Sequence, residues 1–285
     1  MYDITELFCL IDDFCLSFQP IYEKFLKQEQ LRQRFRPASL ALSEILFIAV
    51  WYKQSQINNF KALYQMLRQV YLTAFCKLPC YERLIQLISD HRLALKALHH
   101  SCVDHQIVSH FWIDSTSLPV CKNQRIVRHK TLKSLATRGM SSMGWFYGCK
   151  LHLLMNQFGE LANTQITAGS HADICAVERL TRALKAKIYG DRGYLSKALK
   201  EKLKFRGIEL FTYHRKNMQA VKLTPSDEWN LRQRNKIETV IGLLKGKFGL
   251  ISTKQRSISG YLSNIYASLC AYQLCQKNMP MIFVK

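Results

Sequence analysis

The sequence predicts an α/β protein whose first third is helical and whose remainder forms a mixed sheet with flanking helices. Apolar residues recur at three- and four-residue spacing through the first third, and from about residue 107 short apolar runs alternate with helical segments. The 285 residues suffice for two domains, and 48% of them are hydrophobic, which is enough to form cores. We therefore expect an all-helical domain at 1–105 and an α/β domain at 106–285.

The N-terminal domain is expected to consist of helices only. Apolar residues recur at helical spacing over 40–50 and again over 60–71, and Pro79 marks a break between helices. The most apolar run, 40–52, contains Glu44 and is about two-thirds as long as a membrane span, so we interpret it as a buried helix. The charge of the chain favours a DNA-binding role for this domain, and a helical scaffold is the alternative.

From residue 107 the expected order of elements is strand, strand, strand, helix, strand, helix, strand, helix. Gly207 follows the second of these helices as its C-terminal cap. An apolar helix over 258–276 is expected to pack back on the same domain. A mixed five-stranded sheet with flanking helices in this order is the arrangement of an RNase H-like domain. The expected strands cover 107–114, 144–156, 161–167, 186–191 and 208–213, and the helices cover 172–184, 196–205 and 227–247.

The charge of the chain indicates a polyanionic partner. There are 41 Lys and Arg residues against 20 Asp and Glu, a net charge of +21, and the excess runs along most of the sequence. Nucleic acid is the commonest such partner. No basic amphipathic helix with a clean apolar face is evident, which argues against a membrane surface. The acidic N-terminus does not start like a signal peptide and the ten cysteines are scattered, so we expect a cytoplasmic protein with reduced thiols.

Three carboxylates are isolated within basic stretches. No other acidic residue lies within nine positions of Asp114, Asp191 or Glu238. A lone acid on a phosphate-binding surface weakens binding unless it has a task, and holding a divalent cation is such a task. Asp114 and Asp191 end expected strands that would be neighbours in the sheet, and Glu238 lies on a helix against it. We therefore expect the three side chains to converge.

Phosphodiester chemistry explains the choice of carboxylates. Two metal ions about 3.5–4 Å apart can activate the attacking oxygen and neutralise the leaving oxygen. Mg²⁺ prefers hard oxygen ligands and keeps several waters, so a few carboxylates are enough to hold it. The sequence therefore predicts a site for two Mg²⁺ ions, with Mn²⁺ as an alternative, held by Asp114, Asp191 and Glu238.

Glu238 is flanked by two cations on one helix face. Arg234 precedes it by four residues and Lys245 follows it by seven, which places all three within a narrow stripe at about 100° per residue. That arrangement suits a metal ligand with a phosphate on each side. The alternative is a solvated helix in which Arg234 and Glu238 form an ordinary ion pair.

Each isolated acid lies in a distinctive block: Trp112-Ile-Asp-Ser-Thr, Tyr189-Gly-Asp-Arg-Gly-Tyr194 and Arg234-x-x-x-Glu238-x-x-x-x-x-x-Lys245. These blocks resemble the three catalytic blocks of the DDE transposases of bacterial insertion sequences. The resemblance covers nearly the whole chain and is most specific in three blocks around the isolated acids. The wider group often has a tyrosine three residues before the motif arginine, where this chain has Leu231, so no role of that tyrosine carries over. Finer detail is present in Pro119-Val-Cys-Lys-Asn123, Arg128-His-Lys130 and Ser142-Met-Gly-Trp145, and this detail resembles the insertion sequence 982 family.

The resemblance implies an RNase H-like catalytic domain, dependence on Mg²⁺, and catalytic roles for the three carboxylates. It also implies a homodimer on double-stranded DNA, comprising the element ends and the target, in a bacterial cytoplasm at the nucleoid. Independently, the stretch 122–138 contains six Lys and Arg residues and no acid, which favours phosphate contact. The residues expected to contact DNA are Lys122, Arg125, Arg128, Lys130, Lys133, Arg138, Arg192, Arg234 and Lys245.

Several other residues receive structural interpretations. Asp173 is expected to cap the helix that begins beside it. His152 is expected on a strand face and His171 in a loop, with a place beside the catalytic site as the alternative for both. Trp145 and Tyr147 are expected in the core, with base-stacking platforms as the alternative. A zinc site is an alternative to ordinary surface and core roles for His99, His100, Cys102 and His105, although a matching second half is missing.

The leading functional hypothesis is a transposase that binds the inverted repeats of its element, cleaves at the ends and joins the 3′-OH to target DNA. Two alternatives stay open at this point. One is a two-metal nuclease or resolvase on the same fold that does not transfer strands. The other is a DNA-binding protein with an inactive catalytic domain, against which the intact set of three carboxylates argues.

Overall fold

The computed structural model describes residues 3–31, 34, 38–57, 59–103, 108–182, 184–213, 223–251 and 255–277. The chain divides into two compact units. The helical unit comprises the chain up to Cys102 and again from Leu244, and the sheet unit runs from Val103 to Leu243. The expected domain boundary between residues 105 and 106 lies outside the described residues.

The described part of the helical unit before Cys102 consists of five helices. The first begins with a capping box, in which the Asp3 side chain accepts from the Thr5 amide and the Glu6 side chain accepts from the Asp3 amide. The apolar run around residue 45 forms a helix that is buried along most of its length, as expected. None of the described helices is long and apolar enough to span a membrane. The five are α1 (Ile4–Gln28), α2 (Leu42–Gln54), α3 (Phe60–Gln69), α4 (Tyr81–Asp90) and α5 (Arg92–Ser101).

The last helix, α10 (Ile258–Lys277), packs in the helical unit and not on the sheet as we expected. It lies against α2, α4 and α5. Its polar residues explain part of this choice, because Asn264 accepts a hydrogen bond from the buried Lys53 at 2.6 Å and Lys53 also donates to the Gly249 carbonyl at 3.0 Å. The apolar sequence of a helix predicts that the helix is buried, but it does not predict which elements pack against it, because those elements are distant in the sequence.

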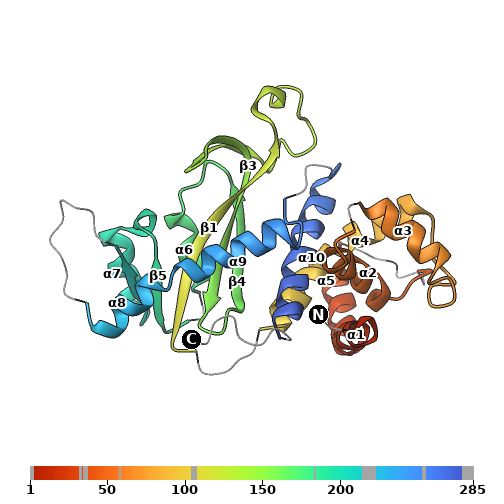
Figure 1. Ribbon diagram of the computed structural model, residues 1–285, viewed down its shortest axis with the longest axis horizontal. Coiled ribbons are helices and arrows are strands. Elements are labelled where there is room, and N and C mark those ends of the chain that lie inside the picture. The colour runs from red at the N-terminus through yellow and green to blue at the C-terminus, as the bar shows by residue number, and fades with distance from the viewer. Residues whose placement is uncertain are drawn as a thin grey trace. The chain divides into compact units, whose positions relative to one another are not determined.

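The sheet unit is built around six strands in the order β2-β3-β1-β5-β6, with β4 also paired to β3 (Figure 1). β1 pairs antiparallel with β3 and parallel with β5, and β5 pairs parallel with β6. The first part of β3 pairs with β2 and the second part with β4, so both lie along the same edge of β3. The strands are β1 (His110–Cys121), β2 (Thr137–Ser141), β3 (Gly144–Asn156), β4 (Leu161–Ala168), β5 (Lys187–Gly190) and β6 (Glu209–Thr212).

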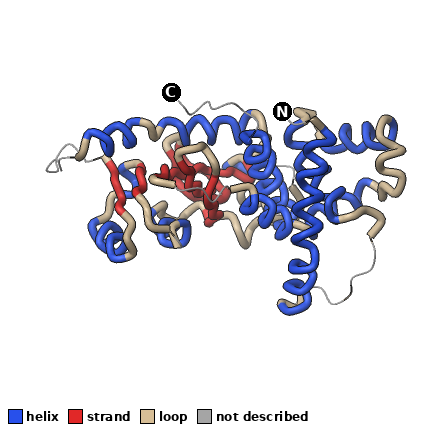
Figure 2. The backbone as a smooth tube through the Cα atoms, turned by 90° about the horizontal axis from the view of Figure 1, so that it is seen from below, coloured by secondary structure: helices blue, strands red, loops and turns tan. Residues whose placement is uncertain are grey.

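Helices cover both faces of this sheet (Figure 2). On one face, α6 (Ile174–Leu180) and α7 (Lys197–Phe205) bury apolar side chains against Phe111 and Ile113 of β1. On the other face lies α8 (Pro225–Arg232), whose Asn230 carbonyl accepts a hydrogen bond from the Trp112 indole at 2.8 Å. It is followed in the chain by α9 (Asn235–Gly246). Successive residues of a strand face opposite ways, so β1 contributes to two separate layers.

The sheet has six strands where we expected five. The additional strand, β2, begins at the end of the basic stretch, which we define as residues 122–138. It has a central glycine, Gly139, and only one residue of the β-branched and aromatic types that mark strands, Thr137. β1 extends seven residues past Asp114 through polar positions and Pro119, and the single helix expected over 227–247 is two helices, α8 and α9, separated at Gln233 and Arg234.

Three backbones meet at the root of the β2–β3 hairpin, where side chains would not fit. A methyl group on Gly139 would collide with the carbonyl of Gly169, and one on Gly148 would collide with the carbonyl of Leu118. The Gly169 amide donates to the Gly148 carbonyl at 3.0 Å, which ties the end of β4 to β3. Glycine is therefore required at this junction for close approach of the strands.

Candidate active site

Asp114 lies on the face of β1 that α8 and α9 cover. Phe111 and Ile113 point to the opposite face, whereas Trp112 reaches α8, so alternation places Asp114 on the side of Trp112. The carboxylate is largely buried and accepts a hydrogen bond from the Ser115 amide at 2.8 Å. This position, in the middle of β1, brings it opposite the start of α9.

Arg234 joins two of the three expected carboxylates. Its guanidinium lies 3.5 Å from the Asp114 carboxylate and 2.6 Å from the Glu238 carboxylate. Asp114 and Arg234 are largely buried, and Glu238 is about half exposed. The contact between Arg234 and Glu238 is the i, i+4 ion pair that we considered as the alternative. Arg234 lies in the turn between α8 and α9, and it also contacts Asp114, which precedes it by 120 residues in the chain.

Asp191 belongs to the same electrostatic neighbourhood. It follows β5, whose last residue Gly190 pairs with Ile113, the residue before Asp114. The pKa of Asp114 is raised to about 6, mainly because the carboxylate is buried; the Ser115 amide and the Arg234 charge oppose this shift, and the charges of Glu238 and Asp191 add to it. The raised pKa of Asp114 therefore reflects above all the cost of burying its charge, with a smaller contribution from the two neighbouring carboxylates.

The side chains do not form a preassembled metal cage. Among the described residues no group of three or more His, Cys, Asp or Glu side chains is arranged to hold a metal ion. Arg234 lies between Asp114 and Glu238 and supplies the positive charge there. The structure therefore brings the two carboxylates onto one guanidinium, with Asp191 close enough to act on Asp114 through its charge.

Tyr194 is a neighbour of this site that the sequence did not single out. Its side chain is buried, and its hydroxyl has no hydrogen bond of standard geometry. Burial, followed by the charges of Asp173, Asp114 and Asp191, raises the pKa of Tyr194 well above its ordinary value. Its place three residues after Asp191, in one of the three blocks, was the available signal.

The comparison with known families decides which class of protein this geometry belongs to. A family model described as Transposase DDE domain matches residues 82–258, more than half of the 285 residues. The chain belongs to the DDE transposase family. The matched segment of the transposase contains Asp114, Asp191 and Glu238 together with the whole basic stretch.

The fold agrees with that assignment. A solved structure described as the cryo-EM structure of a piggyBac transposase synaptic complex with hairpin DNA is similar over 99% of this chain and 83% of that chain, with a TM-score of 0.51. The two sequences are 12% identical, so the likeness concerns the fold alone. No curated protein matches the transposase sequence significantly.

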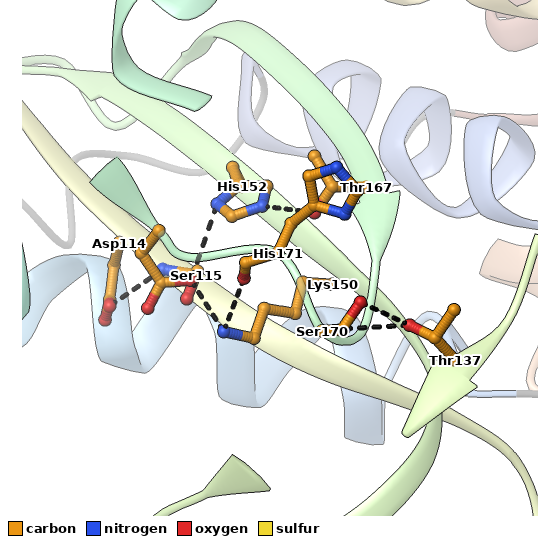
Figure 3. Close-up of polar contacts among 9 residues, drawn as sticks. Asp114, Ser115, Thr137, Lys150, His152, Thr167, Ser170 and His171 are labelled. Atoms are coloured by element: carbon orange, nitrogen blue, oxygen red, sulfur yellow. Dashed lines mark hydrogen bonds and ion pairs between the residues drawn. The ribbon is translucent and has the colours of Figure 1, made fainter. Parts of the chain in front are cut away.

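A second polar cluster lies on the opposite face of the sheet, where Lys150 and His152 of β3 face Asp173 (Figure 3). Lys150 contacts the Asp173 carboxylate at 3.0 Å and donates to the His171 carbonyl at 3.1 Å. The Asp173 side chain makes no capping hydrogen bond to α6, so our interpretation of Asp173 as a helix cap was wrong. Its partner lies 23 residues earlier on a neighbouring strand, beyond the reach of local sequence reasoning.

His152 is neutral in this cluster. It is buried, with its Nε2 atom 2.8 Å from the Thr167 hydroxyl and its Nδ1 atom 3.9 Å from the Asp173 carboxylate. Burial lowers the pKa of His152 to about 4, despite the opposing charge of Asp173. The approach of His152 to Asp173 is therefore not an ion pair at neutral pH, and His152 is a strand-face residue, as expected.

The basic stretch forms an exposed surface of the transposase. After β1 it contains a short 3-10 helix, η1 (Asn123–Arg125), and Figure 1 shows this part of the chain projecting beyond the end of β1. Arg192 is exposed beside Asp191, and Lys245 is on the same helix as Glu238, beyond the point where the sheet unit ends. All six cations of the stretch are exposed: Lys122, Arg125, Arg128, Lys130, Lys133 and Arg138.

The structure also tests the expected burial of Trp145 and Tyr147 and the expected roles of the histidines near residue 100. Tyr147 is buried as expected, but Trp145 is 66% exposed, so its assignment to the core was wrong. Trp145 stands near the start of β3, where β3 is paired only with β2, and the alternation of side chains turns it outward.

His99 is fully buried, and burial lowers its pKa to about 3. The described part of the chain holds no zinc-type cluster there, and His105 lies outside the described residues.

Proposed function

We propose that this transposase, of the insertion sequence 982 type, binds the inverted-repeat ends of its element, cleaves the DNA strands there and joins the free 3′-OH to target DNA. The proposal combines the family match with the three sequence blocks around Asp114, Asp191 and Glu238. The observation that carries it is the placement of Asp114 and Glu238 on one guanidinium, with Asp191 at the end of the strand next to β1, in a sheet whose strand order suits an RNase H-like domain.

The donor set fits divalent metal ions. Asp114, Asp191 and Glu238 offer hard oxygen ligands of the kind that Mg²⁺ and Mn²⁺ prefer. The pKa of Asp114 is raised mainly because its carboxylate is buried, and a bound cation would stabilise the ionised form at that buried position. We propose that these three side chains hold two Mg²⁺ ions, which when bound activate the attacking oxygen and stabilise the leaving oxygen at a phosphodiester.

The chain's cations have separate tasks in this proposal. Arg234 keeps Asp114 and Glu238 oriented toward each other and offers its guanidinium to a phosphate once the carboxylates are otherwise neutralised. Arg192 and Lys245 contact DNA near the cut, and the basic stretch holds the flanking backbone. The helical unit adds DNA-binding surface, and the protein acts as a homodimer because two element ends are processed together, in the cytoplasm at the bacterial nucleoid.

Strand transfer with labelled end-DNA tests this function. The reaction is expected to require Mg²⁺ or Mn²⁺ and to fall by about three orders of magnitude or more in Asp114→Asn, Asp191→Asn and Glu238→Gln, while binding of the same DNA persists. Full activity in any two of these variants would refute the assignment of the site. Metal-dependent cleavage without joining would instead indicate a nuclease or resolvase.

The electrostatic part of the proposal has its own measurement. Affinity for double-stranded DNA is expected to fall steeply with salt, because Lys and Arg release counterions when they contact phosphates. Lys122→Ala or Arg125→Ala should weaken binding and reduce the salt slope by about 1 each, without changing the metal requirement. A salt-insensitive affinity would contradict this arrangement.

A further inference from the structure

Exposed apolar side chains stand at the end of the β2–β3 hairpin. Met140 is 59% exposed, Met143 is 94% exposed and Trp145 is 66% exposed. We call these three residues the hairpin tip. Met140 and Trp145 are directly paired across the two strands, and Met143 lies in the tight turn between them. Side chains paired in this way are neighbours on one face of a sheet, so Met140 and Trp145 form one apolar surface, and Met143 adds an exposed apolar side chain in the turn beyond them.

The same face of the hairpin carries a cation. Arg138 is two residues before Met140 on β2, and both are exposed. The intervening Gly139 is buried, as is Phe146, which follows Trp145 on β3. Because side chains alternate along a strand, one face of the hairpin is packed and the other presents Arg138 beside the apolar tip. The apolar surface therefore continues directly into the basic stretch.

Hydrogen bonds hold the tip in place. The Asn123 side-chain amide of η1 donates to the Trp145 carbonyl at 2.9 Å, which ties the basic stretch to the hairpin. The Ser141 hydroxyl donates to the Gly144 carbonyl at 3.1 Å, and Gly144 has a φ of +102° that closes the turn. The tip is thus presented to solvent by a defined framework and is not a loose end of the chain.

The positive charge around the hairpin tip indicates what kind of partner it binds. The chain contains no acidic residue between Asp114 and Glu160, and this interval holds the six exposed cations of the basic stretch as well as the hairpin. A strongly basic surface that ends in two methionines and a tryptophan is complementary to a polyanion with apolar faces of its own. Nucleic acid has both properties, because its phosphates are anionic and its bases have π-faces on which aromatic side chains stack.

We propose that the hairpin tip contacts unstacked bases of bound DNA, with the Trp145 indole stacked on a base and Met143 and Met140 filling the adjacent step. The exposed Lys and Arg residues of the basic stretch hold the phosphates on either side. This inference rests on the proposed function, in which the partner is DNA. It adds that the transposase recognises a distorted or unpaired site and not only the charge of the backbone.

Binding to two DNA probes tests this contact. One probe is a fully paired duplex, and the other is the same duplex with a short central mismatch that contains 2-aminopurine. Full-length protein is expected to bind the mismatched probe about tenfold more tightly and to quench the 2-aminopurine emission. Trp145→Ala should lose the preference and the quenching, while its affinity for the paired duplex stays within about twofold. Trp145→Phe should keep part of both because it retains an aromatic ring.

Matched controls separate stacking from charge and from general exposure. Phe205 is 94% exposed at the end of α7 in the same unit, and Phe205→Ala should change neither probe. Arg128→Gln should weaken both probes equally and lower the salt slope by about 1.

Three outcomes would overturn the inference. One is a wild-type affinity that does not distinguish the probes, and another is unchanged preference and quenching in Trp145→Ala and Met143→Ala. The third is a Trp145→Ala variant that sediments as a smaller species with its base contact intact, because the tip would then be an interface with a second copy of the chain. Failure of the wild-type protein to bind either probe in a salt-dependent way would refute the proposed function itself.

Discussion

The two faces of the sheet carry two clusters of charged residues that are assembled in opposite ways. On the face of α9, the Arg234 guanidinium contacts both Asp114 and Glu238, and Asp191 acts on Asp114 through its charge. On the face of α6, one carboxylate is matched by one ammonium group, which also donates to a backbone carbonyl. In the first cluster one guanidinium contacts two carboxylates, and in the second one ammonium group contacts one carboxylate. The clusters lie on the adjacent strands β1 and β3.

The difference indicates which cluster is built for stability and which for chemistry. A matched, largely buried pair stabilises the fold once formed, because breaking it leaves one charge unpaired in a poor solvent. A buried carboxylate with a raised pKa, such as Asp114, costs stability at neutral pH, and perturbed pKa values of this kind cluster at functional sites. The expected effects of substitutions on the two faces therefore differ in sign as well as in size.

The largest effect on stability is expected from Lys150→Met. This change leaves Asp173 without its cation and the His171 carbonyl without its donor, so the free energy of unfolding should fall by about 2–3 kcal/mol in urea denaturation. The matched control is Lys202→Met, which breaks a Lys–Glu pair with a similar distance of 2.8 Å but with both side chains exposed. That change should cost less than about 1 kcal/mol. Equal losses in the two variants would remove the distinction between the clusters.

The opposite sign is expected for Asp114→Asn. The pKa of Asp114 is about 6 when folded against an ordinary value of 3.8, so the folded state binds the proton more tightly, and the stability conferred by that proton is lost as the pH rises from about 4 through 6. At pH 7.5, with divalent ions chelated, Asp114→Asn should be more stable than the wild type by about 1–2 kcal/mol. The gain should vanish near pH 4, and Asp173→Asn should show a loss instead. A destabilised Asp114→Asn protein at pH 7.5 would contradict the destabilising effect of the buried, ionised Asp114 carboxylate.

Lys53 in the helical unit isolates the effect of burial alone. Its acceptors are neutral, and burial lowers its pKa from 10.5 to about 7. Between pH 7 and 10.5 the unfolded chain holds this proton while the folded chain has released it, so the free energy of unfolding should rise with pH in that window. The rise from pH 7 to 9 should be about 2 kcal/mol, should be absent in Lys53→Met, and should persist in Lys61→Met, a change on the exposed face of α3. A flat profile for the wild type would show that the ammonium form is as stable as the amine.

The sequence predicted elements best where local patterns were strong. The continuous apolar run of β3 was expected with the observed bounds, and Gly207, with a φ of +74°, ends α7 as its position suggested. β2 was missed because a five-residue strand with a central glycine has no local signature and is defined by its pairing with β3. Pairing of distant segments is not encoded in neighbouring residues, which also explains the unexpected partners of α10.

The sequence alone identified the acidic residues of the candidate site, but it did not predict which side chains contact them. The isolation of Asp114, Asp191 and Glu238 in basic stretches is visible in the sequence. The link from Arg234 to Asp114 spans 120 residues and depends on how the turn before α9 meets β1. The outward position of Trp145 likewise follows from where the sheet ends, which a count of apolar residues does not reveal.

The crowded root of the β2–β3 hairpin has a consequence for how this protein can diverge. Gly139 and Gly148 leave no room for a side chain, so the base of the hairpin is anchored by main chain alone and should tolerate almost no replacement. Between them Phe146 and Tyr147 are buried, whereas Met140, Met143 and Trp145 are exposed and contribute little to the fold. Substitutions at these three exposed positions are therefore expected to be tolerated on an unchanged base, so the outer surface of the hairpin can change without changing the sheet that supports Asp114.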